Sequence, residues 1–281
     1  MVDAIVKNDR FVPFLERSGD NWRDIEPVAQ YEEGLAPICA INYKKDYQEV
    51  MSYFRAVLKA KEVSERAFRL TEEVIDFSEG NYTAWYYRRK LLEELKMPLE
   101  DEMRWLQTNG LSMEKNFQIW HHRKCIAEIL GDDRLDLAAE MQFLHDIFSS
   151  DRKNYHAWSY RTWLVERFQL WTDELDFVDQ MLAVDRGNNS VWSYRYFILN
   201  KAPLGLFKQA APGTVEFVRS EVEFVLPRLR EDLGNEACWV YLRGMFCLTD
   251  DEEQKSKSTN VKRVRMNKLD DLLRPFLLEV H

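Results

Sequence analysis

Two short segments carry residue types that could bind a phosphate or a carboxylate. They are KNFQIWHHRK, which begins at Lys115, and KNYHAW, which begins at Lys153. In each segment a lysine directly precedes an asparagine, a residue type that often caps the start of a helix. A cation beside a helix N-terminus adds its charge to backbone N–H groups that already attract anions. Lys115 and Lys153 are therefore candidate phosphate-binding residues, with a solvated surface lysine as the alternative.

Both segments belong to a repeat that runs through most of the chain. The tryptophan of each copy follows an asparagine by four residues, and an arginine follows three or four residues later. The tryptophans are spaced 35, 38, 34 and 47 residues apart, which is the period of a helical hairpin. The copies are NYTAWYYRR from Asn81, NFQIWHHRK from Asn116, NYHAWSYRT from Asn154, NNSVWSYRY from Asn188 and NEACWVYLR from Asn235.

The second and third copies differ from the others at two positions. Five residues before the tryptophan stand Gly80, Lys115, Lys153, Gly187 and Gly234. Two residues before it stand Thr83, Gln118, His156, Ser190 and Ala237. A functional residue should appear where one copy of the repeat differs from the other copies. Because the second and third copies differ together, we expect one polar patch formed by Lys115, Gln118, Lys153, Tyr155 and His156. The shared asparagines and tryptophans are interpreted as capping and packing residues, and the shared arginines mainly as structural partners of carbonyls or acids.

The repeat predicts an all-α solenoid of antiparallel helical hairpins. A helix begins at or just after each asparagine, and a second amphipathic helix lies between successive copies. One hairpin cannot cover its own apolar stripe, so neighbouring hairpins must stack. We expect an N-terminal arm or irregular cap over residues 1–40, the solenoid over 41–248, a charged loop over 249–263 and a C-terminal helix over 264–281. The expected second helices are 99–106, 135–148, 175–184 and 215–229, preceded by helices 46–58 and 63–77.

Composition and charge exclude several classes of function. Hydrophobic residues make up 46% of the 281 residues, enough for a sizeable core, and only 10 Gly and 8 Pro occur. A net charge of −9 argues against a nucleic-acid partner, which would need a basic surface. No apolar run approaches the roughly 20 residues of a transmembrane helix, and the first residues show no charged region followed by an apolar segment, the pattern expected of a signal peptide. The four cysteines form no CxxC pair and are expected to be reduced, which favours a cytoplasmic protein.

The chain offers no complete catalytic set by itself. His121 and His122 are consecutive on a predicted helix and point about 100° apart, which is a poor arrangement for one metal ion. We expect them to pack in the core or at an interface, and we predict no metal site in this chain. No Gly-rich phosphate loop, nucleophile elbow or Ser/His/Asp set is present.

The repeats resemble those of the protein prenyltransferase alpha subunits, in particular the alpha subunit shared by protein farnesyltransferase and geranylgeranyltransferase type I. The matching stretches run from about Asp20 to Gly244 and include YFRAVL from Tyr53, SERAF from Ser64 and the five repeat segments. The resemblance implies a right-handed superhelical crescent of helical hairpins around a beta subunit that carries a catalytic zinc. It implies prenyl transfer from farnesyl or geranylgeranyl diphosphate to CaaX proteins such as small GTPases, and it leaves open a magnesium ion bound with the diphosphate.

The resemblance also assigns residue roles. Lys115 matches a catalytic lysine that contacts the prenyl diphosphate, and Asn154, Tyr155 and His156 match a group near the same diphosphate. Gln118 matches a residue that binds the peptide carboxylate. Phe117 is placed beside it in the peptide site, although the family commonly has tyrosine there. The chain also stops earlier than is usual after Trp239.

Two other functions remain open at this stage. One is the alpha subunit of the Rab-modifying geranylgeranyltransferase, which would depend on an escort protein. The other is a helical-repeat scaffold that binds protein segments without chemistry. The abundance of aromatic residues, with 9 Trp, 12 Tyr and 16 Phe, favours an obligate complex with a large interface over a free scaffold.

Overall fold

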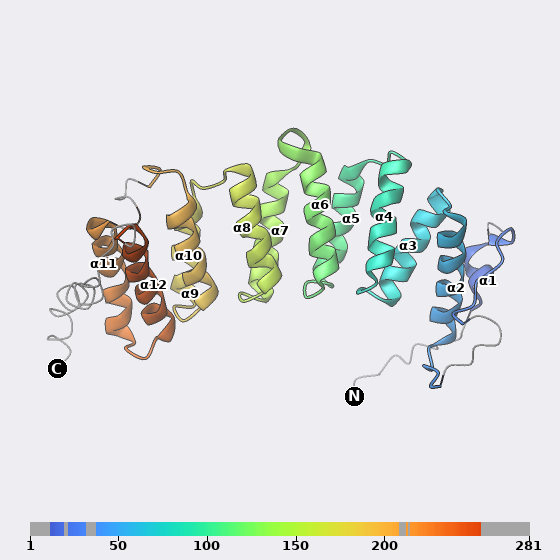
Figure 1. Ribbon diagram of the computed structural model, residues 1–281, viewed down its shortest axis with the longest axis horizontal. Coiled ribbons are helices and arrows are strands. Elements are labelled where there is room, and N and C mark those ends of the chain that lie inside the picture. Colours follow the sequence, from blue (N-terminus) through green and yellow to red (C-terminus); the bar gives the residue numbers. More distant parts are fainter. Residues whose placement is uncertain (1–11, 20–21, 32–37, 208–211, 213, 254–281) are drawn as a thin grey trace, which may run out of the picture. The chain divides into compact units, whose positions relative to one another are not determined.

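The computed structural model describes residues 12–19, 22–31, 38–207, 212 and 214–253, and its regular elements in these residues are all helices (Figure 1). This confirms the predicted all-α class. The chain divides into two compact units at residue 137. The first contains α1 to α6 and the second contains α7 to α12. None of the described helices is long and apolar enough to cross a membrane.

Stacked helical hairpins build the first unit. Helix α3 packs against both α2 and α4, α5 packs against α6, and α4 also contacts α6. Figure 1 shows α4 and α6 in the near layer of this unit, with α3 and α5 behind them. The two helices that carry the repeat tryptophans therefore lie side by side. The helices are α1 (Phe14–Ser18), α2 (Lys45–Ala60), α3 (Glu65–Phe77), α4 (Tyr82–Glu94), α5 (Leu99–Gly110) and α6 (Phe117–Arg134).

The second unit continues the same pattern. Helix α9 packs against α10 and α11 against α12, while α10 contacts both of the other tryptophan-bearing helices, α8 and α12. The predicted helix ranges agree with the observed ones to within a few residues, since each apolar stripe is bounded by a capping residue or a turn. The helices are α7 (Leu137–Ser150), α8 (Tyr155–Phe168), α9 (Glu174–Val184), α10 (Asn189–Lys201), α11 (Val215–Glu231) and α12 (Glu236–Glu253).

The repeat asparagines start the tryptophan-bearing helices, as predicted. The side-chain oxygen of Asn81 accepts the backbone N–H of Ala84, and that of Asn116 accepts the N–H of Gln118. Asn154, Asn188 and Asn235 make the equivalent bonds in the second unit. Each bond satisfies a backbone donor that the helix itself leaves without a partner.

The repeat tryptophans fix the turn that precedes each helix. In every copy the indole N–H donates to the backbone carbonyl of the residue six positions earlier, at 2.8 to 2.9 Å. The indole rings of Trp85 and Trp192 are fully buried. Trp120 and Trp158 are buried as well, whereas Trp239 is half-buried. The first four tryptophans thus stabilise the core and the turn together, which confirms the predicted packing role for these copies.

In three of the tryptophan-bearing helices, α4, α8 and α10, a buried arginine links the helix to the one that follows it. Arg88 forms two hydrogen bonds with Glu102, Arg161 with Glu174, and Arg195 with Glu221, all between 2.6 and 3.0 Å. The predicted structural role of these arginines, as partners of acids, is confirmed. A buried carboxylate and a buried guanidinium are tolerated because each satisfies the other.

The structure describes parts of the segments predicted at the two ends of the array. The described part of residues 1–40 packs on α2, where the Phe14 ring stacks on Tyr53 at 4.4 Å, and on α3, where Arg66 binds Asp24. Helix α12 continues to Glu253. Residues 249–253 of the predicted charged loop are therefore helical, because a charged run with two glutamates can extend a solvated helix as easily as form a loop. The rest of that loop and the predicted helix over 264–281 lie outside the described residues.

Candidate functional site

The turn before α6 holds Lys115 on a rigid backbone. The carbonyl of Glu114 accepts the Trp120 indole N–H at 2.8 Å. On the other side of Lys115, the Asn116 N–H donates to the Met113 carbonyl at 2.9 Å while the Asn116 side chain caps α6. The exposed Lys115 side chain therefore extends from a backbone that is fixed at both neighbouring residues.

An open cavity of about 450 Å³ lies along this turn. It is lined by Glu79 and by residues 111–116, which include Lys115. The charged residues that line the cavity are the two acids Glu79 and Glu114 and the lysine Lys115, so the local charge is mixed. An ammonium at the positive end of a helix can bind an anion here, and the nearby carboxylates limit how strongly it does so.

Phe117 and Gln118 occupy the first turn of α6. Gln118 is half-buried and its backbone N–H donates to the Asn116 side chain at 2.7 Å. Phe117 is exposed, and its ring lies almost parallel to that of His121, with 5.9 Å between the ring centroids. An amide side chain next to a helix N-terminus is suited to bind a carboxylate.

The turn before α8 is built in the same way. The Lys153 N–H donates to the Asp151 carboxylate at 3.1 Å, and the Asn154 N–H donates to the Asp151 carbonyl at the same distance. The Arg152 carbonyl accepts both the Trp158 indole and the side-chain amide of Asn188, which caps α10. Two successive helix starts in the second unit are thus tied to one carbonyl.

The candidate residues of this turn differ in accessibility. Tyr155 is 76% exposed and His156 is half-buried, with its ring set edge-on to that of Tyr155. Lys153 is exposed, and its ammonium lies 3.9 Å from the Asp185 carboxylate. Asn154 is only 4% exposed because its side-chain oxygen caps the helix. Of the four, Tyr155, His156 and Lys153 can reach a ligand, whereas Asn154 shapes the turn that carries them.

The two turns belong to different units of the chain. Lys115, Phe117 and Gln118 lie in the first, and residues 153–156 lie in the second. Each turn is well defined by itself. That the two form one polar patch stays a prediction.

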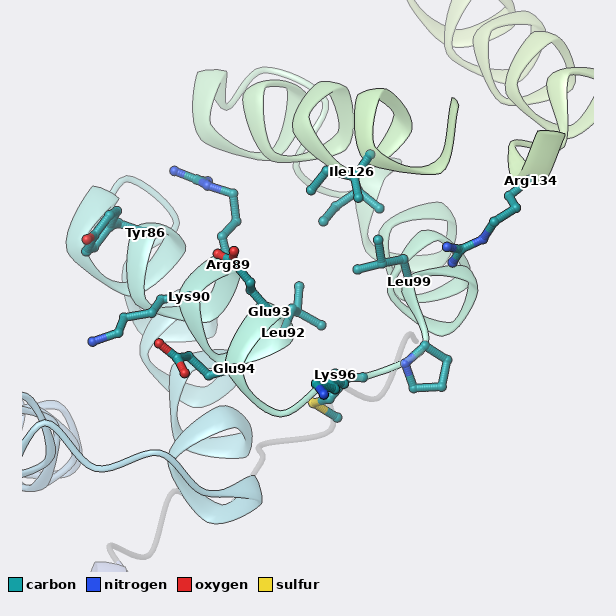
Figure 2. Close-up of a pocket in the computed structure, with 13 residues that line it drawn as sticks. Tyr86, Arg89, Lys90, Leu92, Glu93, Glu94, Lys96, Leu99, Ile126 and Arg134 are labelled. Carbon is teal, nitrogen blue, oxygen red and sulfur yellow. The ribbon is translucent and has the colours of Figure 1, made fainter. Parts of the chain in front are cut away.

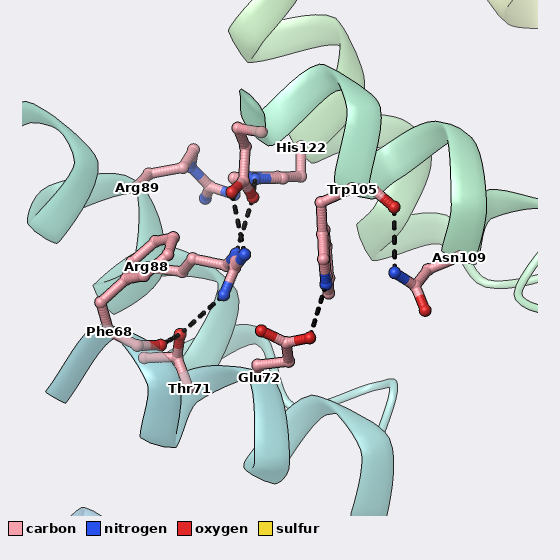
Figure 3. A network of polar contacts seen from close by, with 9 residues as sticks. Phe68, Thr71, Glu72, Arg88, Arg89, Trp105, Asn109 and His122 are labelled. Carbon is pink, nitrogen blue, oxygen red and sulfur yellow. Dashed lines mark hydrogen bonds and ion pairs between the residues drawn. The ribbon is translucent and has the colours of Figure 1, made fainter. Parts of the chain in front are cut away.

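His122 is a core residue, as predicted. It is fully buried on α6 and its Nε2 lies 2.7 Å from the Glu102 carboxylate, while its Nδ1 faces Arg89 at 3.5 Å (Figure 3). Burial lowers the pKa of His122 despite the nearby carboxylate. The ring is therefore neutral, and it donates from Nε2 to Glu102 and accepts at Nδ1.

The carboxylate of Glu102 stays ionised in this buried position. Burial alone would raise its pKa, but the hydrogen bond from His122 and the charge of Arg88 outweigh burial and hold the pKa of Glu102 below its usual value. Figure 3 shows the same network reaching Thr71 and Glu72 of α3 through Arg88 and Trp105. This cluster connects four helices, α3, α4, α5 and α6, through hydrogen bonds between their side chains.

No group of three His, Cys, Asp or Glu side chains suited to a metal ion occurs among the described residues.

The repeat motif did not reveal the acids that pair with the arginines. Glu102, Glu174 and Glu221 each also bind a side chain that follows them by 20 residues, namely His122, Tyr194 and Tyr241. That constant spacing was present in the sequence and could have identified the network.

Comparisons with known proteins agree with the repeat architecture. Residues 64–95, 137–168 and 171–202 match the family described as protein prenyltransferase alpha subunit repeat. These segments correspond to the hairpins α3–α4, α7–α8 and α9–α10. The repeat unit of that family therefore ends with the tryptophan-bearing helix.

Individual relatives cover most of the chain. The protein farnesyltransferase/geranylgeranyltransferase type-1 subunit alpha of Dictyostelium discoideum is 40% identical over 85% of this chain and 73% of the relative. A solved structure, Candida albicans protein geranylgeranyltransferase-I complexed with GGPP, has a TM-score of 0.71 and 37% identity, covering 82% of this chain and 76% of that chain. The geranylgeranyl transferase type-2 subunit alpha of Dictyostelium discoideum is only 25% identical, over 43% of this chain and 44% of the relative.

Proposed function

This chain belongs to the family of protein farnesyltransferase/geranylgeranyltransferase type-1 alpha subunits, and we propose that its Lys115 and Gln118 contact the two substrates of that enzyme. The enzyme transfers a farnesyl or geranylgeranyl group to a cysteine thiol near the C-terminus of a protein, and the alpha subunit acts only as part of a heterodimer. The similarity over 85% of the chain carries the family assignment. The much lower similarity to a type-2 subunit disfavours the Rab-modifying alternative.

In the transfer, a bond forms between the cysteine sulfur and the first carbon of the prenyl group. The bond from that carbon to the diphosphate oxygen breaks, and the diphosphate leaves with the bonding electrons. The thiol proton is lost to solvent. Negative charge therefore grows on the leaving diphosphate, and a positively charged group beside it lowers the barrier.

Lys115 is the residue that we propose for this role. Its support is the fixed turn, the exposed ammonium beside an open cavity, and the fact that only the second and third repeats carry a lysine there. Tyr155 and His156 are proposed as further diphosphate contacts. Asn154 supports them by capping α8.

Gln118 is proposed to bind the terminal carboxylate of the CaaX peptide. Its amide can donate two hydrogen bonds, and its place in the first turn of α6 adds the favourable helix dipole. Phe117 offers an exposed aromatic surface next to it for the apolar side chains of the peptide.

The remaining groups are proposed to come from a beta subunit. We assign zinc to that partner, where a metal would stabilise the substrate cysteine as its thiolate. A magnesium ion bound with the diphosphate would share in neutralising its charge. The residues of this chain would hold the diphosphate and the peptide terminus in place.

Prenyl transfer by heterodimers with Lys115→Ala and Lys115→Arg tests the proposal. We expect Lys115→Ala to lower kcat by about 100-fold, the usual cost of removing one group that stabilises transition-state charge, and Lys115→Arg to restore part of it. Lys59→Ala, at an exposed lysine of α2, is the matched control. An unchanged kcat for Lys115→Ala would falsify the catalytic assignment.

A further inference from the structure

Lys153, in the turn before α8, faces a carboxylate of the turn before α10. Its ammonium lies 3.9 Å from Oδ2 of Asp185. The two turns are tied to each other, because the side-chain amide of Asn188 donates to the Arg152 carbonyl at 3.1 Å. Figure 1 shows both turns at the same edge of the second unit. The ion pair therefore connects two neighbouring turns whose spacing is fixed.

The two members of the pair differ in how firmly they are held. Oδ1 of Asp185 accepts the backbone N–H of Gly187 at 3.1 Å, which fixes the carboxylate in its own turn. The Lys153 side chain is 64% exposed, and a lysine side chain is long and flexible. The lysine is therefore the partner that can move when another anion approaches.

This contact is looser than an exposed ion pair of the first unit. A cavity of about 870 Å³, the α4–α6 groove, opens between those two helices (Figure 2). It is lined by residues of both helices and of the turn after α4, among them Tyr86, Ile126, Ile129 and Arg134. Arg134 contacts Glu100 at 3.0 Å, a hydrogen-bond distance, whereas 3.9 Å is too long for a hydrogen bond between Lys153 and Asp185. A loose, exposed pair of this kind costs little to open.

The repeat shows that the fold uses the aspartate without the lysine. Asp232, in the turn before α12, holds the position of Asp185, and its carboxylate accepts the Gly234 N–H at 2.9 Å. In the turn that precedes it, before α10, the position equivalent to Lys153 is Gly187. The aspartate thus serves the turn in both places, and the lysine of the turn before α8 serves a different purpose.

The surroundings of Lys153 favour an anion as its second partner. Tyr155 and His156, both proposed above as diphosphate contacts, follow it in the first turn of α8. The start of that helix adds backbone N–H groups and the positive end of the helix dipole. Because a diphosphate carries more negative charge than one carboxylate, it can take the ammonium away from Asp185.

We propose that Lys153 and Asp185 form an ion pair that the prenyl diphosphate opens. Lys153 leaves Asp185 to contact the bound diphosphate, and Asp185 takes the ammonium back as the product diphosphate departs. The proposal rests on the proposed function, which supplies the diphosphate. Lys153 contributes equally to binding before and after the transfer, whereas Lys115 acts on the charge that grows in the transition state. Asp185 thereby limits inhibition by the product.

Heterodimers with Lys153→Ala, Asp185→Asn and both changes test the pair. Asp185→Asn keeps an oxygen for the Gly187 N–H and removes only the charge. The Kd for farnesyl diphosphate and the inhibition constant of inorganic diphosphate are measured together with kcat, using a farnesyltransferase beta subunit.

Each variant has a distinct expected result. Lys153→Ala should weaken the binding of both diphosphates by about tenfold, the cost of one hydrogen bond between charged groups, with kcat changed by less than about twofold. Asp185→Asn should tighten both by about threefold, the size of a weak exposed ion pair. The double variant should bind like Lys153→Ala, because Asp185 acts through the lysine.

Asp232→Asn is the matched control, because it makes the same change in the same kind of turn, next to a turn that has Gly187 in place of the lysine. It should leave both binding constants within about twofold of the wild type. Binding of both diphosphates by Lys153→Ala as tight as by the wild type would overturn the proposal. An Asp185→Asn effect that persists in the double variant would also overturn it. A wild-type heterodimer that forms but transfers no prenyl group would instead count against the proposed function.

Discussion

At the scale of single residues, the shared positions of the repeat proved structural and the departures from it remain the functional candidates. The asparagines cap helices and the tryptophans bond to turns in all five copies. Lys115 and Lys153 stand on those turns where other copies have glycine. The common scaffold fixes the backbone so that a single substitution on it presents a charge in a defined place.

Gln118 gives a prediction at this scale. If its amide binds the peptide carboxylate, Gln118→Ala should raise the KM for a CaaX peptide by about tenfold, the cost of one hydrogen bond to a charged group. The wild-type heterodimer should discriminate against the same peptide with a C-terminal amide, and the variant should lose that discrimination. Equal KM ratios for acid and amide peptides in both proteins would rule out the assignment.

At the scale of elements, three buried glutamates, Glu102, Glu174 and Glu221, each join three helices. Glu174 of α9 accepts hydrogen bonds from Arg161 of α8 and from Tyr194 of α10. Glu221 of α11 does the same for Arg195 and Tyr241. The exception is Glu102, whose second partner is His122 instead of a tyrosine.

His122 should therefore make the stability of the folded protein depend on pH, an effect that the equivalent residues Tyr194 and Tyr241 do not have near neutral pH. Its folded pKa is lowered by burial, so the unfolded chain binds a proton below about pH 6.5 that the folded chain does not. Unfolding is then favoured by acid, and stability falls as the pH drops below that value, by no more than about 1.4 kcal/mol per pH unit. Above that pH, His122 is neutral in both the folded and the unfolded chain and does not change the stability.

The variant His122→Tyr tests this expectation. Tyrosine should fit, because the Trp85–His122 ring geometry, 5.1 Å and 50°, matches Trp192–Tyr241 at 5.0 Å and 50°. Melting curves of the heterodimer between pH 7 and about pH 5 should show a smaller slope for His122→Tyr than for the wild type. His145→Gln, at an exposed histidine, is the control. Parallel pH profiles for the wild type and His122→Tyr would contradict the prediction.

At the scale of the whole molecule, the buried groups that the repeat shares bond to one another within the fold. Arg88, Arg161 and Arg195 pair with buried glutamates, and the repeat indoles bond to their own turns. The side chains left to contact substrates, such as Lys115 and Gln118, are exposed or half-buried at the surface. This suits a subunit that contributes positioned side chains to a shared site.

The length of the transferred prenyl group gives a prediction at this scale. If this chain supplies only diphosphate and peptide contacts, the same alpha subunit paired with a farnesyltransferase or a geranylgeranyltransferase type-1 beta subunit should change donor preference with the partner. Competition assays with both diphosphates measure this directly. Lys115→Ala should lower kcat with both donors by a similar factor, and a donor-specific loss would place chain-length selection partly in this subunit.

The sequence by itself determined the helices, their caps and the repeat, because capping and apolar periodicity depend on residues within a few positions of each other. It also identified Lys115 and Lys153 as departures from a regular pattern. Only the tertiary structure decided which acids pair with Arg88, Arg161 and Arg195, that Asn154 is buried by its capping role, and that α4 and α6 leave a groove between them. Those features join residues that are 13 to 26 positions apart or lie on separate helices, beyond the few positions over which capping and apolar periodicity act.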